Sequence, residues 1–285
     1  MIWSTHGSVL GVSPARQQTG ISLLRASAGE ASAPQGRGMP ALQGEGDFEL
    51  VDVSSYRADL ARRREVKFVF SHPDIRALAR ILEGNGKRQV YNREVSCVRS
   101  VYFDDPGLSA CRANLDGLGR RRKLRLRWYD RPLPGHECFL EIKWRENRVT
   151  GKHRMFLRSR DVLGNMPYKT LLAKLAAVLP ERHLPTLWQY SEPTVLVEYQ
   201  REHFASPDRR LRATLDYGLV YYDQTGRQRI STSFGRPHEG LLVLEGKVPV
   251  GCDHELRPFL HPLSGRIARC SKYVYGCQML GLIGE

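Results

Sequence analysis

Residues 120–130 read RRRKLRLRWYD, and residues 137–145 read ECFLEIKWR. In an extended chain, successive side chains point to opposite faces of the sheet. Lys123, Arg125 and Arg127 therefore share one face of the first stretch. The opposite face carries Leu124, Leu126 and Trp128. Two such stretches in succession predict neighbouring strands of a sheet that is apolar on its core side and densely charged on the other side.

The charged face can be interpreted in two ways. Charged strand faces are usually exposed to water, and half-exposed antiparallel strands often alternate in this manner. A charged face can also line the inside of a closed barrel, where it is stable only if it is hydrated and matched by a polyanion. These two strands alone do not decide between the two interpretations.

The composition favours an anionic partner. The chain has 285 residues, a formal net charge of +14, a pI near 9.8 and 41% hydrophobic residues. This length fits one large domain or two small ones, and the apolar fraction is sufficient for a core. The positive charge points to nucleic acid, a phosphate-rich small molecule or an acidic membrane surface, without choosing among them.

The cysteines and the apolar segments indicate a cytoplasmic protein. The six cysteines are scattered, without CxxC pairs or a histidine at metal-ligand spacing, and this pattern is typical of a reducing compartment. No apolar run approaches the length of a membrane span, and the first residues lack the pattern of a signal peptide.

Hydrophobic periodicity predicts a tail followed by one folded domain. Residues 1–55 are rich in Gly, Ser, Ala, Gln and Pro, so we expect a disordered tail there and a folded domain over residues 56–285. Helices are expected from Ser71 to the glycines at 84 and 86, over 167–179 and over 271–282. Strands are expected over residues 64–70, 97–103, 120–130, 137–143, 150–157, 193–203, 211–216, 219–222 and 241–248. Because few of these strands are separated by helices long enough for a parallel crossover, the expected fold class is α+β with a mainly antiparallel sheet.

Charged side chains that share a strand face recur along the whole domain. An ordinary wet sheet face would mix in Thr, Ser and Gln, whereas here the residues are nearly all ionisable. A closed sheet would let such charges converge on a string of phosphates, with arginine binding in a bidentate manner and lysine acting as a point charge. The recurring pairs are Glu65 with Lys67, Arg125 with Arg127, Glu141 with Lys143, Lys152 with Arg154, Arg212 with Asp216, and Glu245 with Lys247.

Nine short motifs in one order resemble the triphosphate tunnel superfamily, and within it the polyphosphate polymerases of the vacuolar transporter chaperone (VTC) type. The resemblance runs from about residue 64 to residue 276. It implies an eight-stranded antiparallel β tunnel with flanking helices, which binds ATP and a growing polyphosphate chain together with Mn²⁺ or Mg²⁺. No single motif is specific alone; the nine are REVKF, VRSVYFD, KLRLRWYD, FLEIK, GKHRMF, VEYQREHF, RATLD, VLEGK and SKYVYG.

The resemblance also implies which residues hold phosphate and metal. The bases implied as catalytic are Lys67, Arg125, Arg127, Lys143, Arg201 and Lys272. Further phosphate-binding bases are Lys152, Arg212 and Lys247, with Arg154 and Arg99 as weaker matches. Glu245 resembles the metal ligand, and the secondary candidates are Glu65, Glu141 and Glu198. For Glu141 and Glu198, a salt bridge to a neighbouring base is an equally good interpretation.

One departure from the superfamily pattern favours a polymerase. In tunnel triphosphatases of the CYTH type, the first strand has the pattern Glu-x-Glu-x-Lys. This chain is similar to them in Glu65 and Lys67, but Arg63 stands in place of the earlier acid. The expected reaction is transfer of the ATP γ-phosphate to inorganic polyphosphate, with release of ADP. The alternative is a triphosphatase of the same fold. A non-catalytic polyanion- or RNA-binding module is a remoter alternative, and no nucleic-acid partner is expected, because the aromatic residues lie mostly on the apolar strand face.

Overall fold

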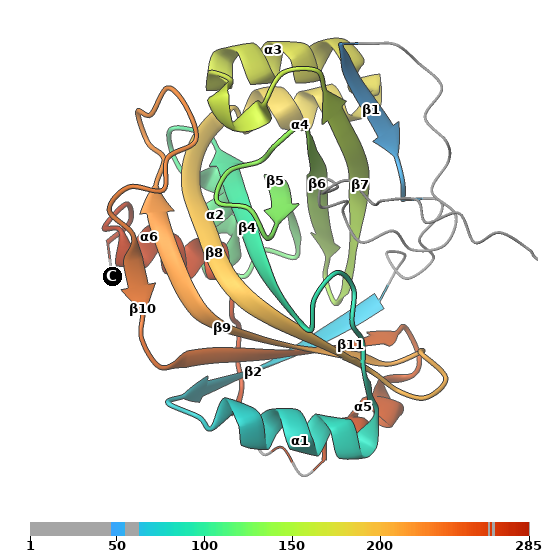
Figure 1. Ribbon diagram of the computed structural model, residues 1–285. Helices are drawn as coiled ribbons and strands as arrows, with labels where there is room; N and C mark the ends of the chain where they lie inside the picture. Colours follow the sequence, from blue (N-terminus) through green and yellow to red (C-terminus); the bar gives the residue numbers. More distant parts are fainter. Residues whose placement is uncertain (1–46, 55–62, 262, 264–265, 285) are drawn as a thin grey trace, which may run out of the picture. The chain divides into compact units, whose positions relative to one another are not determined.

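The strands form one antiparallel sheet whose path returns to its starting strand (Figure 1). The computed structural model describes residues 47–54, 63–261, 263 and 266–284. Among the described strands, eight follow one another around a ring in the order β7–β6–β5–β4–β8–β9–β11–β2, and β2 then pairs with β7. A single residue pair, Arg63 with Thr150, closes the ring. The predicted α+β fold with an eight-stranded antiparallel ring and flanking helices is therefore confirmed.

The ring strands agree with the predicted segments except at one point. Residues 211–216 and 219–222 form a single strand, β9, in which Gly218 has a φ of +61° opposite an irregularity in β8. Glycine adopts this conformation without strain, so the chain can bulge there without leaving the sheet. The ring strands are β2 (Arg63–Ser71), β4 (Val95–Asp104), β5 (Arg120–Tyr129), β6 (Glu137–Glu146), β7 (Val149–Ser159), β8 (Glu192–Ala205), β9 (Arg212–Asp223) and β11 (Leu241–Pro249).

Short strands extend the ring at its edges, and none of them was predicted. β1 (Phe48–Asp52) pairs with β7, β3 (Lys87–Arg88) with β8, β10 (Arg236–His238) with β9, and β12 (Arg266–Ile267) with β2. β1 lies inside the range that the sequence assigned to the tail, because a five-residue strand with little periodicity of its own is recognisable only through its partner. Residues 1–46, the rest of that range before β1, lie outside the described residues.

Helices cover the outside of the ring on two sides (Figure 1). The three predicted helices are present as α1 (Ile75–Asn85), capped by the Asp74 side chain, α3 (Tyr168–Val178) and α6 (Lys272–Met279), capped by Ser271. The sequence did not predict α2 (Ser109–Leu115), α4 (Leu184–Gln189), α5 (Asp253–Leu260) or the single 3₁₀ turns η2 (Leu163–Asn165) and η3 (Glu181–His183). In the described part of the chain, no helix is both long enough and apolar enough to cross a membrane.

The apolar core is divided by the strands into outer and inner parts. Helices α3 and α4 cover the outer faces of β4 to β7 through residues such as Leu124, Leu140 and Leu171. Helices α1 and α5 cover the outer faces of β9 and β11. Helix α6 packs on the inner side of β8, where Tyr273 stacks on Tyr102 with ring centroids 5.0 Å apart. The interior of the ring is therefore only partly free for charged side chains.

A small apolar cluster covers the inner face of the sheet near the start of β6 and the end of β7. Phe139 and Phe156 are cross-strand partners in β6 and β7, and Val53, which follows β1, packs against both. All three side chains are at most 5% exposed. We call these three residues the apolar cluster. Through Val53, the segment that begins with β1 contacts the interior of the ring as well as its edge strand.

Candidate functional site

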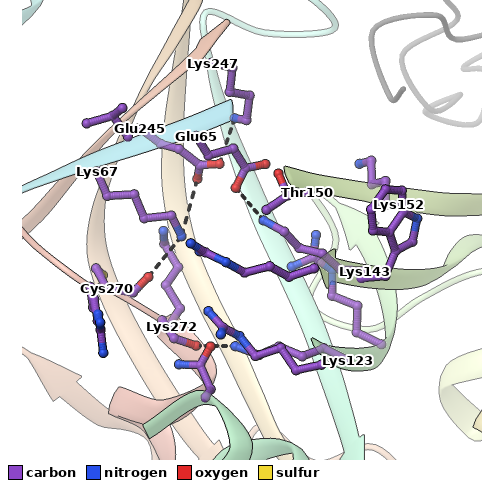
Figure 2. A pocket seen from close by; sticks show the side chains of 18 of the residues that line it. Glu65, Lys67, Lys123, Lys143, Thr150, Lys152, Glu245, Lys247, Cys270 and Lys272 are labelled. Carbon is purple, nitrogen blue, oxygen red and sulfur yellow. Dashed lines mark hydrogen bonds and ion pairs between the residues drawn. The ribbon is translucent and has the colours of Figure 1, made fainter. Parts of the chain in front are cut away.

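A cavity of about 580 Å³ lies inside the ring and is lined mostly by basic side chains (Figure 2). Among the described residues that line it, thirteen are bases and only two, Glu65 and Glu245, are acids. A volume in this range is typical of ligand sites. The bases are Arg63, Lys67, Arg121, Lys123, Arg125, Arg127, Lys143, Arg145, Lys152, Arg201, Lys247, Arg269 and Lys272.

Strand register brings three lysines into one row across β5, β6 and β7. Lys123 lies directly opposite Lys143, and Lys143 lies directly opposite Lys152. Like charges opposite one another destabilise a sheet. Glu65 beside Lys143 and Glu141 beside Lys152 offset part of this repulsion, whereas Lys123 has no carboxylate partner among the described residues.

Lys123 is the least compensated cation of this row. Burial, together with the nearby charges of Lys67 and Lys143, holds its pKa well below the usual lysine range. Its ammonium group donates to the hydroxyl of Ser271, with Nζ and Oγ 2.6 Å apart. Figure 2 shows Lys67, Lys123 and Lys143 reaching into the same space from three different strands. A phosphate group in that space would relieve the repulsion among them.

Two fully buried carboxylates lie next to the lining and orient its bases. Glu141 is 0% exposed and pairs with Arg125 at 2.6 Å and Lys152 at 2.8 Å, while Arg154 lies 3.3 Å away. Burial raises the pKa of Glu141, but the surrounding cations outweigh it and hold that pKa well below its usual range. Because its oxygens are already taken by bases, Glu141 acts as a counter-ion in the structure.

Asp216 is the second of these carboxylates. It accepts two hydrogen bonds from Arg201, each 2.6 Å long, and it pairs with Lys272 at 2.6 Å. The Tyr199 ring lies beneath both cations, with its centroid 5.1 Å from the Arg201 guanidinium and 4.9 Å from the Lys272 ammonium group. These contacts hold the two bases, which come from β8 and α6, at one place in the cavity wall.

Tyrosine and serine hydroxyls orient the two arginines of β5. Arg125 donates to Tyr102 over 2.7 Å, and Arg127 donates to Ser100 over 2.9 Å and to Tyr199 over 3.1 Å. A guanidinium group held in this way keeps a fixed plane for bidentate contact with phosphate. The wall is therefore organised before any ligand arrives.

Glu65 and Glu245 are the acids of the cavity wall, and they suit a divalent metal. They lie on the paired strands β2 and β11, where Glu65 is bonded to Lys143 at 2.6 Å and Glu245 lies 3.2 Å from Lys247. Burial raises the pKa of Glu65, but Lys143 and Arg63 bring it to about 2, so its carboxylate is ionised. Burial likewise opposes ionisation of Glu245, and its lysine neighbours hold its pKa well below the usual range.

The donor set fits a magnesium-type ion. Such ions take one or two protein carboxylates and complete their coordination with phosphate and water. Among the described residues, no three His, Cys, Asp or Glu side chains gather closely enough to hold a metal without a ligand's help. Two ionised carboxylates beside a basic wall therefore match a divalent metal that completes its coordination with an anionic ligand and water.

Most of the predicted site residues meet in this cavity, but several do not line it. Lys67, Arg125, Arg127, Lys143, Lys152, Arg201, Lys247, Lys272, Glu65 and Glu245 all line it. Arg154 and Glu141 lie on the same inner face, two residues further along β7 and β6 than Lys152 and Lys143, without lining the cavity. Arg212 lies opposite Lys247 in the register of β9 and β11 and does not line the cavity either. Arg99 and Glu198 do not line the cavity. They form a salt bridge with each other, with the two charged groups 2.7 Å apart.

Sequence reasoning missed part of the wall. The site prediction omitted Lys123, although it shares the face of Arg125 and Arg127, and it omitted Asp216, although it shares a strand face with Arg212. Both could have been found by strict alternation along the strand. Tyr102 and Tyr199 lie on the inner faces of β4 and β8, where Tyr102 is directly opposite Arg125 and Tyr199 shares the strand face of Arg201. Arg269 carries no such signal, because it belongs to the connection after β12.

The fold and the site together define a class: an antiparallel β ring with a basic interior, which is the architecture of triphosphate tunnel proteins. The model of the VTC domain family matches residues 62–281, and the chain belongs to this family. No curated protein matches the chain.

Three solved structures resemble the fold at low identity. The protein PH1819 of Pyrococcus horikoshii OT3 has a TM-score of 0.40 at 12% identity, with 75% of this chain and 98% of that chain covered. A putative adenylyl cyclase of Hippeastrum, described as having a dominant triphosphatase activity, has a TM-score of 0.35 at 14% identity, with 65% and 79% covered. A putative adenylate cyclase of Vibrio parahaemolyticus has a TM-score of 0.37 at 12% identity, with 77% and 86% covered.

Proposed function

We propose that the protein is a metal-dependent polyphosphate polymerase, which transfers the γ-phosphate of ATP to a growing chain of inorganic polyphosphate and releases ADP. The observation that carries the proposal is the row of Lys123, Lys143 and Lys152 inside a cavity with thirteen basic and two acidic described lining residues. Each phosphate unit of a linear polyphosphate chain carries negative charge, so the whole length of the chain can contact such a wall. Membership of the VTC domain family supports the same ligand class.

The lining residues would act by position and charge. Arg125, Arg127 and Arg201 would hold the transferred phosphate and its neighbours, since phosphoryl transfer depends mainly on alignment and charge stabilisation. An oxygen of the terminal chain phosphate attacks the γ-phosphorus, the bond from that phosphorus to the β–γ bridging oxygen breaks, and ADP leaves with that oxygen. Lys67, Lys143 and Lys272 would stabilise the charge that gathers on the departing and attacking oxygens.

Glu245, with Glu65 beside it, would hold Mn²⁺ or Mg²⁺. When bound, the ion supplies a Lewis acid for the phosphate oxygens. Glu141 and Glu198 are left out of this set, because the first is surrounded by bases and the second is paired with Arg99.

A triphosphatase of the same fold is the second candidate, and it differs only in the acceptor. Water as acceptor needs activation by a base with a pKa near the working pH. Glu65 has a pKa of about 2, and the pKa of Glu245 is also held well below its usual range. Neither carboxylate is therefore suited to act as a general base, and a triphosphatase would depend on a bound metal to activate the water.

A nucleic-acid module is less favoured by the placement of the aromatic side chains. Trp128 is 3% exposed and belongs to the outer core. Tyr102 and Tyr199 at the cavity are buried and bonded to arginines. Base stacking requires exposed aromatic faces.

A cytoplasmic location is part of the proposal. All six cysteines are free thiols, and free thiols are usual where the compartment is reducing. Fractionation of the source cells with an antibody to the protein tests the location, and recovery outside the cytoplasm would refute it.

The proposal is tested by incubating the purified chain with ATP and Mn²⁺ and separating ADP, free phosphate and polyphosphate. We expect polyphosphate in a molar amount, counted as phosphate units, equal to ADP. Arg127→Ala should lower the rate by about 10²–10³-fold, the usual cost of one group that stabilises the transition state. Glu245→Gln should abolish the response to Mn²⁺.

The matched control is Arg158→Ala, which removes a half-exposed arginine of β7 whose partner is the surface residue Glu137. Its rate should equal that of the unmodified chain. Free phosphate without polymer would move the protein to the triphosphatase alternative, and absence of turnover would leave a polyanion-binding cavity.

A further inference from the structure

Three arginines at one end of the cavity have no role in the proposed transfer. Arg121 and Arg145 lie directly opposite each other on β5 and β6, two residues beyond the pair formed by Lys123 and Lys143. Arg269, which follows β12, lines the same end of the cavity. We call these three residues the mouth arginines. At about 3.3 Å per residue, they lie about 7 Å further along the strands than the lysine row.

The polypeptide holds the mouth arginines in place without neutralising them. Arg121 donates to the carbonyl of Leu118 over 2.5 Å, and Arg145 donates to the carbonyl of Asn147 over 2.6 Å. Arg269 packs against the turn at Gly117, whose φ is +70°, and its Nη1 lies 2.7 Å from the point that a Cβ at Gly117 would occupy. Within the described ranges of the chain, none of the three forms an ion pair with a carboxylate.

The three charges act on one another. Burial, together with the charges of Arg145 and Arg269, lowers the pKa of Arg121. Bases that face each other across a strand pair destabilise the sheet unless an anion lies between them. The mouth arginines therefore repeat the unbalanced arrangement of the lysine row, but at the rim of the cavity.

The opposite end of the same strands is closed to a charged chain. Beyond Arg127 and Glu141, the inner faces of β6 and β7 continue into Phe139 and Phe156, which Val53 covers. A phosphate chain gains nothing by entering this apolar cluster, because it would lose its hydration without a basic partner. On this face of the described strands β5 to β7, the base beyond the apolar cluster is the exposed Arg158, which is paired with Glu137, so positive charge without a carboxylate partner lies toward the mouth arginines.

We propose that Arg121, Arg145 and Arg269 form a second phosphate subsite, which holds the part of a linear polyphosphate chain that extends beyond the transfer site. The ligand class rests on the proposed function, but binding by these residues does not require turnover. Three guanidinium groups at the rim can contact successive phosphates in a bidentate manner. A chain too short to reach the rim would use only the inner lysines and arginines.

The test compares the binding of two linear inorganic polyphosphates, one with three phosphates and one with about fifteen, by calorimetry in EDTA so that no metal-dependent turnover occurs. The unmodified chain should bind the longer ligand more tightly. In the variant Arg121→Gln/Arg145→Gln/Arg269→Gln, the longer ligand should lose at least about tenfold in affinity, which corresponds to about 1.4 kcal/mol. The affinity for tripolyphosphate should fall by a clearly smaller factor, because the mouth arginines act on it only through their charge at a distance, which salt partly screens.

A matched control removes the same net charge elsewhere. Arg227, Arg229 and Arg236 are exposed residues of β10 and the connection before it, and they do not line the cavity. Their triple glutamine variant should keep the preference for the longer chain. The proposal is overturned if the mouth variant keeps that preference, if it weakens both ligands equally, or if the control variant loses as much affinity.

The two proposals can fail separately. If the chain makes no polymer from ATP but still shows a length preference that depends on the mouth arginines, the polymerase proposal fails and the subsite remains. If polymer is made and the length preference does not depend on these arginines, the subsite proposal fails alone.

Discussion

Asp216 shows at the scale of one residue how the empty cavity is kept stable. Its carboxylate is 0% exposed and is shared by Arg201 and Lys272. Burial raises its pKa, but these two cations outweigh burial and lower it, so the ion pairs contribute to stability above the ordinary pKa of 3.8 and are lost as the pH falls below it. At neutral pH the carboxylate offsets two buried positive charges.

Asp216→Asn should therefore destabilise the ligand-free protein strongly. Removing one partner of a buried ion pair costs about 3–5 kcal/mol, because the other charges are left buried and unpaired. Saturating tripolyphosphate should reduce this deficit, since its phosphates can take the place of the carboxylate. Urea denaturation with and without tripolyphosphate measures both effects.

The control is Glu137→Gln, which breaks the surface pair with Arg158. It should cost less than about 1 kcal/mol, and the cost should not depend on tripolyphosphate. A deficit for Asp216→Asn that is equally large with and without the ligand would mean that the ligand does not bind near Arg201 and Lys272.

Lys247 should couple phosphate binding to proton uptake. Burial lowers its pKa to about 8, although the neighbouring Glu245 acts in the opposite direction. A bound phosphate favours the ammonium form and raises the pKa toward its ordinary value of 10.5. Between about pH 8 and 10, binding should therefore take up a proton at this residue, and the affinity should fall as the pH rises.

Calorimetry of tripolyphosphate binding at pH 9, in two buffers with different ionisation enthalpies, measures this uptake. Lys247→Arg keeps the charge but does not titrate in this range, so its proton uptake should be smaller. Protons that the ligand itself takes up or releases contribute equally for both proteins, so the difference in uptake between them comes from Lys247. Equal uptake by the two proteins would show that Lys247 remains charged in the empty cavity.

Part of the site was predictable from residue types and part was not. Alternation along β5 places Lys123, Arg125 and Arg127 together, and the structure agrees. The same rule separates Glu198 from Arg201, which are three residues apart on one strand, so Glu198 could have been excluded from the cavity in advance. Alternation also places Tyr199 on the face of Arg201, but its bond to Arg127 could not be predicted, because β5 and β8 are far apart in sequence.

At the scale of one element, β1 and the residue after it link the start of the described chain to the interior of the ring. Val53 is 5% exposed within the apolar cluster, and its N–H donates to the carbonyl of Arg154 over 2.9 Å. The hydroxyl of Ser54 accepts from the N–H of Arg154 over 2.8 Å. β1 therefore supports the strand that carries Lys152 and Arg154.

Two truncations separate β1 from the sequence before it. Removing residues 1–46 should leave the free energy of unfolding unchanged, as expected for the predicted tail. Removing residues 1–54 should lower it by about 2 kcal/mol or more, because burial of a valine side chain alone contributes about 1.5–3 kcal/mol. Urea denaturation of both shortened chains measures the difference, and equal stabilities would show that β1 does not contribute to the fold.

The elements that the sequence did not predict share a physical cause. β1 and β12 are short and obtain their hydrogen bonds from a partner strand. α2 begins after Leu108, whose φ is +58°, and α5 contains Pro258, so neither has an ordinary helix signal. The long ring strands were predictable because each carries its own alternation, whereas these elements have no comparable pattern of their own.

At the scale of the whole molecule, the ring converts a basic sequence into a basic interior. Alternation predicts that charges share a face, but only closure of β2 on β7 makes that face an inside. Since closure joins residues far apart in the chain, no local pattern reports it. The sequence signals for it were the nearly all-ionisable strand faces and the family resemblance.

The central claim is that a phosphate of the chain, and not water, accepts the γ-phosphate of ATP. The most direct measurement is to run the reaction with ATP and Mn²⁺ in water enriched in ¹⁸O and to analyse the products by mass spectrometry. The account predicts polyphosphate without ¹⁸O at the new bridging positions and little free phosphate. Free phosphate carrying one ¹⁸O for each ADP formed would contradict it, because the acceptor would then be water.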